Sequence, residues 1–180
     1  HDCNLNNLNR MDCLTPIVEN LNHSNLHYLK RTGVYTCADT DFIVWDVWDK
    51  EKDYIKAKDV PGDRTKVVLF HGTVDKCETD LGFNLPSDVK ITKFKGYDLG
   101  LLGDIHKRQH LNKDETISYC GSLVQQNHGE DIGKGYLLWD VPTRKSKYIE
   151  IPNDYGYYTI NIDNNTLPDL SDLPKKPRLR

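Results

Sequence analysis

The chain has 180 residues, the size of one domain or of one domain with the beginning of another, with 37% hydrophobic residues, 28% charged residues and a formal net charge of −3. No stretch approaches the roughly 18 consecutive apolar residues of a membrane span, and the mildly acidic charge excludes a protein that binds nucleic acid through overall basicity. Five scattered cysteines without a Cys-x-x-Cys pair argue against a disulfide framework or a structural zinc site and favour an intracellular location.

One helix and several strands are predicted in the first 70 residues. Apolar residues recur at three- and four-residue steps from Leu5 to Leu21, which predicts an amphipathic helix with a kink or a break at Pro16. The charged segment 49–66 predicts a loop that holds one short helix. The strands expected in this part, from β-branched and aromatic runs, cover residues 28–36, 42–48 and 66–70.

The rest of the chain is predicted to be richer in strands than in helices. Ser87 is placed to cap a short helix that runs towards Phe94. From Asn164 onward the chain is polar and rich in proline, which predicts a linker or an irregular wrap. The strands expected in this part cover residues 98–102, 116–120, 135–141, 147–151 and 157–163.

Two of the predicted strands end on side chains that bind metals. The first apolar run ends in His71, and the second ends in Gly103-Asp104 with His106 two residues later. Because open α/β sheets place their sites at the carboxyl ends of strands, we expect His71, Asp104 and His106 to converge on one rim. Imidazole and carboxylate together suit two divalent cations about 3.5–4 Å apart that hold a phosphate during attack by water. Taken singly, each histidine is more simply a structural residue at a strand end.

Further motifs follow in a characteristic order along the chain. The motifs are His1-Asp2, His71-Gly72, Gly103-Asp104-Ile105-His106, Tyr119-Cys120-Gly121-Ser122-Leu123, Gly129-Glu130 and Lys134-Gly135-Tyr136. This order resembles that of the calcineurin-like metallophosphoesterases, and more closely that of the SbcD-type nuclease subunits of DNA double-strand-break repair. The resemblance is strong over residues 67–141, looser over the opening helix and weak in the loops between them.

The resemblance implies an α/β fold in which two mixed sheets pack as a sandwich flanked by helices, with the amino-terminal part missing. Residues 1–152 would form the carboxyl-terminal portion of a calcineurin-like phosphoesterase domain, and residues 153–180 would begin a capping, DNA-contacting domain or a linker. The chain starts without an initiator Met, just after the Gly-Asn of the family's Gly-Asn-His-Asp motif, so we expect a fragment. Because other family ligands precede that point, we expect this polypeptide alone to bind metal poorly and to be inactive.

The resemblance also implies roles for single residues. His71 and His106 correspond to metal-binding histidines, and Asp104 stands where the family usually has the first histidine of a Gly-His-x-His motif. The carboxylate adds a negative charge that either shifts the site towards manganese or magnesium or weakens one metal. His1 corresponds to the histidine that donates a proton to the leaving oxygen, with Asp2 as its partner.

The sequence indicates the residues that contact the substrate less clearly than it indicates the metal ligands. Lys107 and Arg108 follow the last predicted ligand and are placed to meet phosphates, although a solvated basic pair is the simpler interpretation. Gln125 and His128 lie in the segment 121–130, which resembles a loop beside the family's active site. A glycine-bounded turn explains that segment equally well.

The sequence therefore predicts the nuclease subunit of an SbcC–SbcD-like DNA repair complex, which hydrolyses DNA phosphodiesters with two divalent metal ions, Mn²⁺ first and Mg²⁺ second. By resemblance, its partners would be DNA, a coiled-coil ATPase and a second nuclease protomer, in the cytoplasm, the nucleoid or the nucleus. Two alternatives stay open. A phosphoprotein phosphatase or a cyclic-nucleotide phosphodiesterase would share the metal motifs, and a catalytically inactive scaffold for a partner ATPase is compatible with Asp104.

Overall fold

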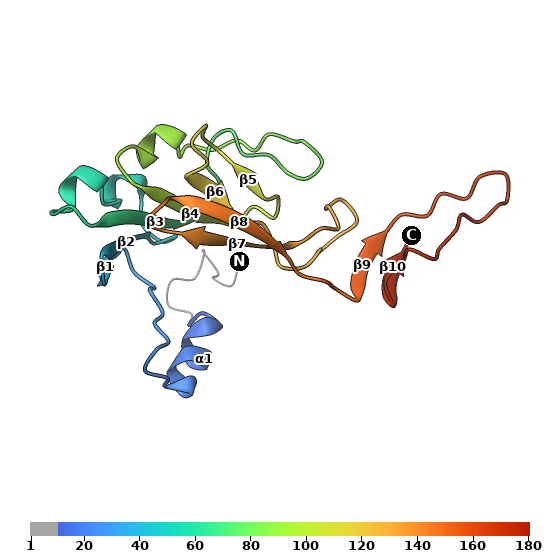
Figure 1. The fold of residues 1–180 in the computed structure, drawn as a ribbon, viewed down its shortest axis with the longest axis horizontal. Helices are drawn as coiled ribbons and strands as arrows, with labels where there is room; N and C mark the ends of the chain where they lie inside the picture. Colours follow the sequence, from blue (N-terminus) through green and yellow to red (C-terminus); the bar gives the residue numbers. More distant parts are fainter. Residues whose placement is uncertain (1–10) are drawn as a thin grey trace.

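The computed structural model describes residues 11–180, which form a mixed α/β protein with a multi-stranded sheet and little helix (Figure 1). Within this range, no helix combines the length and the apolar character that crossing a membrane requires. The helices are α1 (Leu14–Leu21) and the 3-10 helices η1 (Glu51–Asp53), η2 (Ala57–Asp59) and η3 (Ile91–Phe94). The strands are β1 (Gly33–Cys37), β2 (Thr40–Trp45), β3 (Thr65–His71), β4 (Leu99–Gly103), β5 (Gln109–His110), β6 (Ile117–Tyr119), β7 (Gly135–Asp140), β8 (Lys145–Glu150), β9 (Tyr155–Tyr158) and β10 (Lys176–Leu179).

A six-stranded sheet in the order β1-β2-β3-β4-β6-β5 forms the centre of the described structure. β2, β3, β4 and β6 run parallel, whereas β1 and β5 are antiparallel edge strands. β3 and β4 lie in the middle, and their valine- and leucine-rich sequences suit interior strands of a parallel sheet. The register pairs His71 with Gly103, so the carboxyl ends of these two strands are direct neighbours.

An aromatic cluster packs around β2 and β3. The Trp45 indole stacks on the Tyr54 ring with 4.6 Å between centroids, and it meets Phe70 and Phe94 at 5.8 and 5.1 Å. Aromatic pairs of this kind contribute about 0.5–1.5 kcal/mol each beyond the area that they bury. The predicted loop 49–66, which holds η1 and η2, is therefore a packed part of the core.

Asp12 caps the amino end of α1. Its carboxylate accepts a hydrogen bond from the backbone N–H of Thr15 (2.7 Å). Hydrogen bonds from the Lys30 ammonium and then from Thr15 hold the pKa of the Asp12 carboxyl well below its ordinary value. Pro16 lies in the first turn, where its missing N–H removes no helical hydrogen bond, so the predicted kink is wrong for the described helix. The predicted start at Leu5 lies outside the described residues.

The predicted cap at Ser87 is also wrong. The Ser87 hydroxyl donates to the carbonyl of Thr73 and accepts from the N–H of Val89. It therefore closes a loop, and η3 begins only at Ile91, whose N–H donates to the carboxylate of Asp75 (2.5 Å).

β7 and β8 form a separate antiparallel hairpin. The Arg108 guanidinium lies 4.0 Å from the centre of the Tyr148 ring, and the Lys134 ammonium donates to the carbonyl of His106 (3.1 Å), so the hairpin is fastened to the loop after β4. In residues 11–180 the strands outside the central sheet form two-stranded pairs, with little helix beside them. The predicted metallophosphoesterase sandwich, and the predicted boundary between residues 152 and 153, stay predictions.

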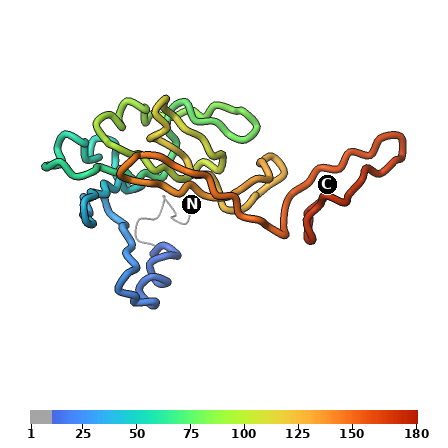
Figure 2. Tube along the Cα trace, in the orientation of Figure 1, coloured from blue at the N-terminus to red at the C-terminus, as the bar shows by residue number. Residues whose placement is uncertain are grey.

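β9 and β10 form a two-stranded parallel sheet that extends away from the central sheet (Figure 2). The expected linker after Asn164 is wrong for Lys176–Leu179, because these residues pair with Tyr155–Tyr158. The local sequence carries little signal for this strand, since Pro177 is unusual in a strand except at a sheet edge. We call β9 and β10 together the carboxyl-terminal arm.

Candidate functional site

β3 brings His71 to the rim of the sheet. The strand buries Val67 and Val68 completely, and its last side chain, His71, is 54% exposed. Gly103 lies opposite His71 in the register, and a Cβ atom at Gly103 would stand 2.8 Å from the Nδ1 atom of His71. The glycine at the end of β4 therefore makes room for the imidazole at the end of β3.

Tyr119 in β6 anchors the loop that follows His71. Its side chain is fully buried, and its hydroxyl donates to the carbonyl of Gly72 (2.6 Å) and accepts from the N–H of Val74 (2.9 Å). Burial raises the pKa of the Tyr119 hydroxyl far above its ordinary value, so the hydroxyl stays protonated and able to donate. Tyr119 stands in one of the motifs above, but nothing in the sequence indicated this anchoring role.

Asp104 follows β4 directly and faces His71. Its Oδ1 atom lies 3.8 Å from the Nε2 atom of His71, and its side chain is 17% exposed. Two groups at this distance suit one cation between them, because a first-row divalent metal lies about 2 Å from an imidazole nitrogen or a carboxylate oxygen. The φ angle of Asp104 is +92°, a strained conformation that is concentrated at functional sites in folded proteins.

His106 lies two residues further along the same loop. Its Nδ1 atom is 3.0 Å from the Oε1 atom of Glu130, and its side chain is 41% exposed. Its carbonyl accepts hydrogen bonds from the Lys134 ammonium and from the N–H of Ser122 (3.3 Å). Gly121 permits this approach, because its φ is +80° and a Cβ atom there would lie 2.9 Å from the His106 carbonyl oxygen.

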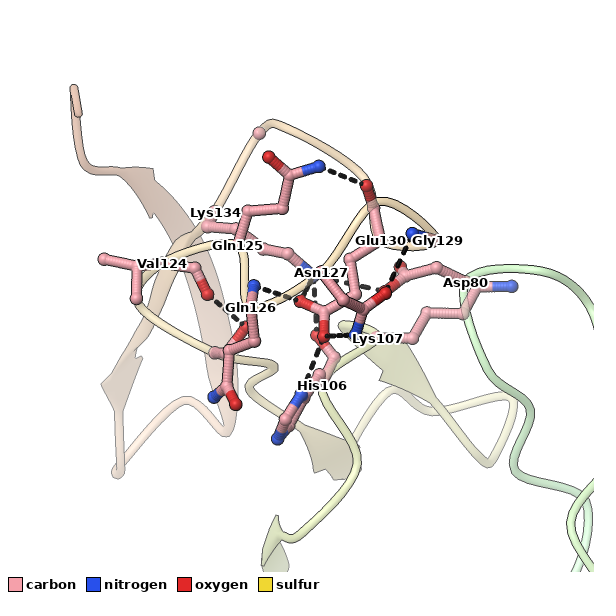
Figure 3. A network of polar contacts seen from close by, with 12 residues as sticks. Asp80, His106, Lys107, Val124, Gln125, Gln126, Asn127, Gly129, Glu130 and Lys134 are labelled. Atoms are coloured by element: carbon pink, nitrogen blue, oxygen red, sulfur yellow. Dashed lines mark hydrogen bonds and ion pairs between the residues drawn. The ribbon is translucent and has the colours of Figure 1, made fainter. Parts of the chain in front are cut away.

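A buried polar network lies on one side of His106 (Figure 3). The Lys134 ammonium lies 3.2 Å from Asp80 and 3.3 Å from Glu130, and all three side chains are 5–7% exposed. Burial alone would raise the pKa of the Glu130 carboxyl, but the hydrogen bonds from His106 and Gln126 and the charge of Lys134 outweigh burial and lower it. Glu130 is therefore a carboxylate at neutral pH.

Asp104 lines two neighbouring cavities. One has a volume of about 570 Å³ and is lined by His71, Asp104 and mostly apolar residues of the sheet, α1 and neighbouring loops. The other has a volume of about 350 Å³, and its lining includes Asp104, His106 and Glu130. Within residues 11–180, no group of three or more His, Cys, Asp or Glu side chains is close enough to hold a metal ion. His1 and Asp2, the predicted proton donor and its partner, lie outside the described residues.

The four predicted substrate-binding residues have partners within the protein. Lys107 forms an ion pair with Glu78, and Arg108 lies on the Tyr148 ring as described above. The Gln125 amide accepts from the N–H of Tyr157 (2.7 Å) and donates to its carbonyl (3.2 Å).

His128 also packs against the arm. Its ring meets the Tyr157 ring edge-on at 5.0 Å, and its Nδ1 atom is buried without a hydrogen-bond partner in the described part of the chain. The segment 121–130 thus connects the arm to the loop that carries His106, and substrate binding by Lys107, Arg108, Gln125 and His128 stays a prediction.

Three residues of the site had no predicted role. Glu130 and Lys134 belong to the motifs quoted above. A charged residue directly beside a glycine was the sequence feature that could have marked each of them as part of the site. Asp80 lies in the long loop between β3 and β4, and no motif marked it. The local sequence pattern predicts where a strand ends. It does not predict which charged residues from distant parts of the chain form buried ion pairs.

Comparison with curated proteins finds a viral relative. No protein-family model matches the chain. The whole chain aligns with part of an uncharacterized protein of Acanthamoeba polyphaga mimivirus, at 39% identity over 192 residues. The chain spans 14% of the length of that protein. The viral relative's name carries no activity, so the geometry of the site and the motifs carry the functional argument.

Proposed function

We propose that this chain belongs to a metal-dependent nuclease that hydrolyses DNA phosphodiesters, the nuclease subunit of an SbcC–SbcD-like repair complex. The observation that carries the proposal is the pairing of His71 and Asp104 at 3.8 Å across the carboxyl ends of two parallel strands, with His106 on the same loop as Asp104. Imidazole and carboxylate from adjacent strand ends are a donor set suited to Mn²⁺ or Mg²⁺.

The donor atoms available in the described residues fit part of a two-metal site. His71 and Asp104 would hold one cation between them, and His106 would offer a further nitrogen from the neighbouring cavity. Two bound cations would neutralise the charge of a phosphodiester and activate water. Because fewer than three of these ligands cluster in residues 11–180, the proposal requires ligands beyond this range. His1 would supply a proton to the leaving oxygen, with Asp2 beside it.

The carboxyl-terminal arm supports a nucleic-acid substrate. Lys176 lies 5.1 Å from the centre of the Tyr155 ring, and Arg178 lies 5.2 Å from the centre of the Tyr157 ring and donates to its hydroxyl (2.7 Å). Alternate residues of a strand share one face, so these cations form a row that continues to Arg180, about 6.6 Å apart along the strand. Rows of cations and aromatic rings are typical of surfaces that follow a nucleic-acid backbone.

The proposed nuclease function also implies binding partners. A coiled-coil ATPase and a second nuclease protomer would bind this subunit, and the complex would act inside the cell. A different metallophosphoesterase is the runner-up, and a catalytically inactive scaffold is favoured by one observation, the carboxylate of Asp104 where the family it resembles usually has histidine.

A nuclease assay of the full-length protein with Mn²⁺ tests the proposal. We expect DNA cleavage that requires Mn²⁺ and that falls by more than about 100-fold in the His71→Ala variant, since loss of a ligand exceeds the roughly 10–100-fold effect of an outer partner. His27→Ala, an exposed histidine outside the site, is the matched control and should cleave like the wild type.

Each alternative has its own result. Hydrolysis of phosphopeptides or cyclic nucleotides with intact DNA would replace the nuclease by another phosphoesterase. A folded protein that binds a partner ATPase but hydrolyses none of these substrates would identify a scaffold.

A further inference from the structure

The ring of His106 is oriented by one carboxylate. The distance from Nδ1 to the Oε1 atom of Glu130 is 3.0 Å, and Figure 3 shows the other ring nitrogen pointing away from the network. A carboxylate accepts hydrogen bonds and cannot donate them, so Nδ1 must carry the hydrogen. In the neutral ring this leaves the lone pair on Nε2, which is the form that binds a metal.

Glu130 is itself held from several sides. Its Oε2 atom accepts from the N–H of Gln126 (3.1 Å) and from the Lys134 ammonium (3.3 Å), and its Oε1 atom also accepts from the Asn127 amide (2.8 Å). The side chain is 7% exposed, so little water competes for these bonds. A carboxylate fixed in this way restricts the rotation of the imidazole that it contacts.

The same network fixes the backbone of His106. Lys134 donates to the His106 carbonyl (3.1 Å) while it pairs with Glu130 and Asp80. Both ends of the histidine, its ring and its carbonyl, are therefore tied to one buried group of charges. Two carboxylates against one ammonium leave a net negative charge beside the imidazole, which favours a cation at its far nitrogen.

We propose that Glu130 is a positioning residue that fixes the tautomer and the orientation of His106 so that Nε2 faces a divalent cation. The proposal rests on the function proposed above and adds a role for a residue that contacts neither substrate nor metal. Glu130 acts through His106, while Lys134 and Asp80 hold Glu130 in place.

The tautomer of His106 tests this role directly. In metal-free full-length protein labelled with ¹⁵N-histidine, at mildly alkaline pH, we expect the NMR spectrum to show His106 with hydrogen on Nδ1. A hydrogen on Nε2 in the wild type would overturn the proposal without any variant. Glu130→Gln should shift His106 towards a mixture of the two tautomers, because an amide can donate as well as accept.

Mn²⁺ binding by titration calorimetry gives the second readout. We expect Glu130→Gln to weaken Mn²⁺ binding by about 10–100-fold, as for other partners of metal-binding histidines. The matched control is Asp80→Asn, which disturbs Lys134 in the same network without touching the ring, and which should keep the Nδ1–H tautomer. Equal weakening in the two variants, with the tautomer unchanged in both, would mean that Glu130 is merely structural and would overturn the proposal.

Failure of the function and failure of this role give different results. Wild-type protein that binds no Mn²⁺ overturns the proposed function and this role with it. Wild-type protein that binds Mn²⁺ and cleaves DNA, together with a Glu130→Gln variant that does both equally well, overturns the role of Glu130 alone. If Glu130→Gln does not fold, the wild-type tautomer still decides.

Discussion

His71 and His106 are held in place by different means. His71 ends an interior strand beside Gly103 and Asp104, and the loop that follows it is anchored by the hydroxyl of Tyr119. His106 lies in a loop, and a network of buried charges holds both its ring and its carbonyl. The first arrangement depends on the register of the sheet, and the second depends on charges that come from two separate segments, the loop with Asp80 and the segment with Glu130 and Lys134. We expect the two regions to respond very differently to loss of a single polar group.

The largest effect is expected from removing the charge at the centre of the network. Lys134→Met leaves Asp80 and Glu130 buried without their cation, and breaking a buried pair in this way costs about 3–5 kcal/mol of unfolding free energy. Urea unfolding followed by circular dichroism measures the loss.

Lys107→Met is the matched control for that measurement. It removes a lysine whose partner Glu78 is 41% exposed, and exposed pairs contribute about 0–1 kcal/mol. Similar losses in the two variants would mean that the network around Lys134 is not special.

A smaller effect is expected on the side of His71. Tyr119→Phe leaves the N–H of Val74 and the carbonyl of Gly72 without their buried partner, which costs about 1–3 kcal/mol. The same urea experiment should rank Tyr119→Phe between Lys134→Met and the control Tyr35→Phe, whose hydroxyl bonds the carbonyl of Arg31 near the surface. A greater loss in Tyr119→Phe than in Lys134→Met would reverse the comparison between the two regions.

The smallest effect is expected where the loop meets the arm. Gln125→Ala removes both hydrogen bonds to the backbone of Tyr157 and should lower the local opening free energy there by about 1 kcal/mol, which is about fivefold faster hydrogen exchange of the Tyr157 amide. The neighbouring Gln126→Ala keeps the backbone bond to Glu130 and should leave that exchange rate unchanged. Equal rates in the two variants would show that the arm does not depend on this amide.

The difference between the surroundings of His71 and those of His106 also explains which structural features the sequence predicts well. β3 and β4 were expected within one residue of their observed bounds, because a run of buried aliphatic residues followed by glycine is a local signal. The adjacency of His71 and Asp104 follows from that signal and from the rule that sites form at strand ends.

Non-local features were missed for a common reason. Asp80 meets Glu130 and Lys134 only after the loop between β3 and β4 has folded against the segment before β7, and β10 becomes a strand only by pairing with β9. The predicted kink at Pro16 is absent from α1 because the effect of a proline depends on where the helix begins. In each case the decisive partner is distant in the chain, or depends on an element boundary that local patterns place imprecisely.

The backbone at Asp104 has a further consequence. Its φ of +92° strongly disfavours β-branched and bulky apolar side chains, whereas aspartate, asparagine and histidine are the non-glycine residues found most often at positive φ. Aspartate and histidine, the residue usual at this position in the family that the chain resembles, are therefore both compatible with this backbone conformation. A single substitution can exchange one for the other while the loop keeps its path, so the electrostatic character of this rim can change independently of its shape.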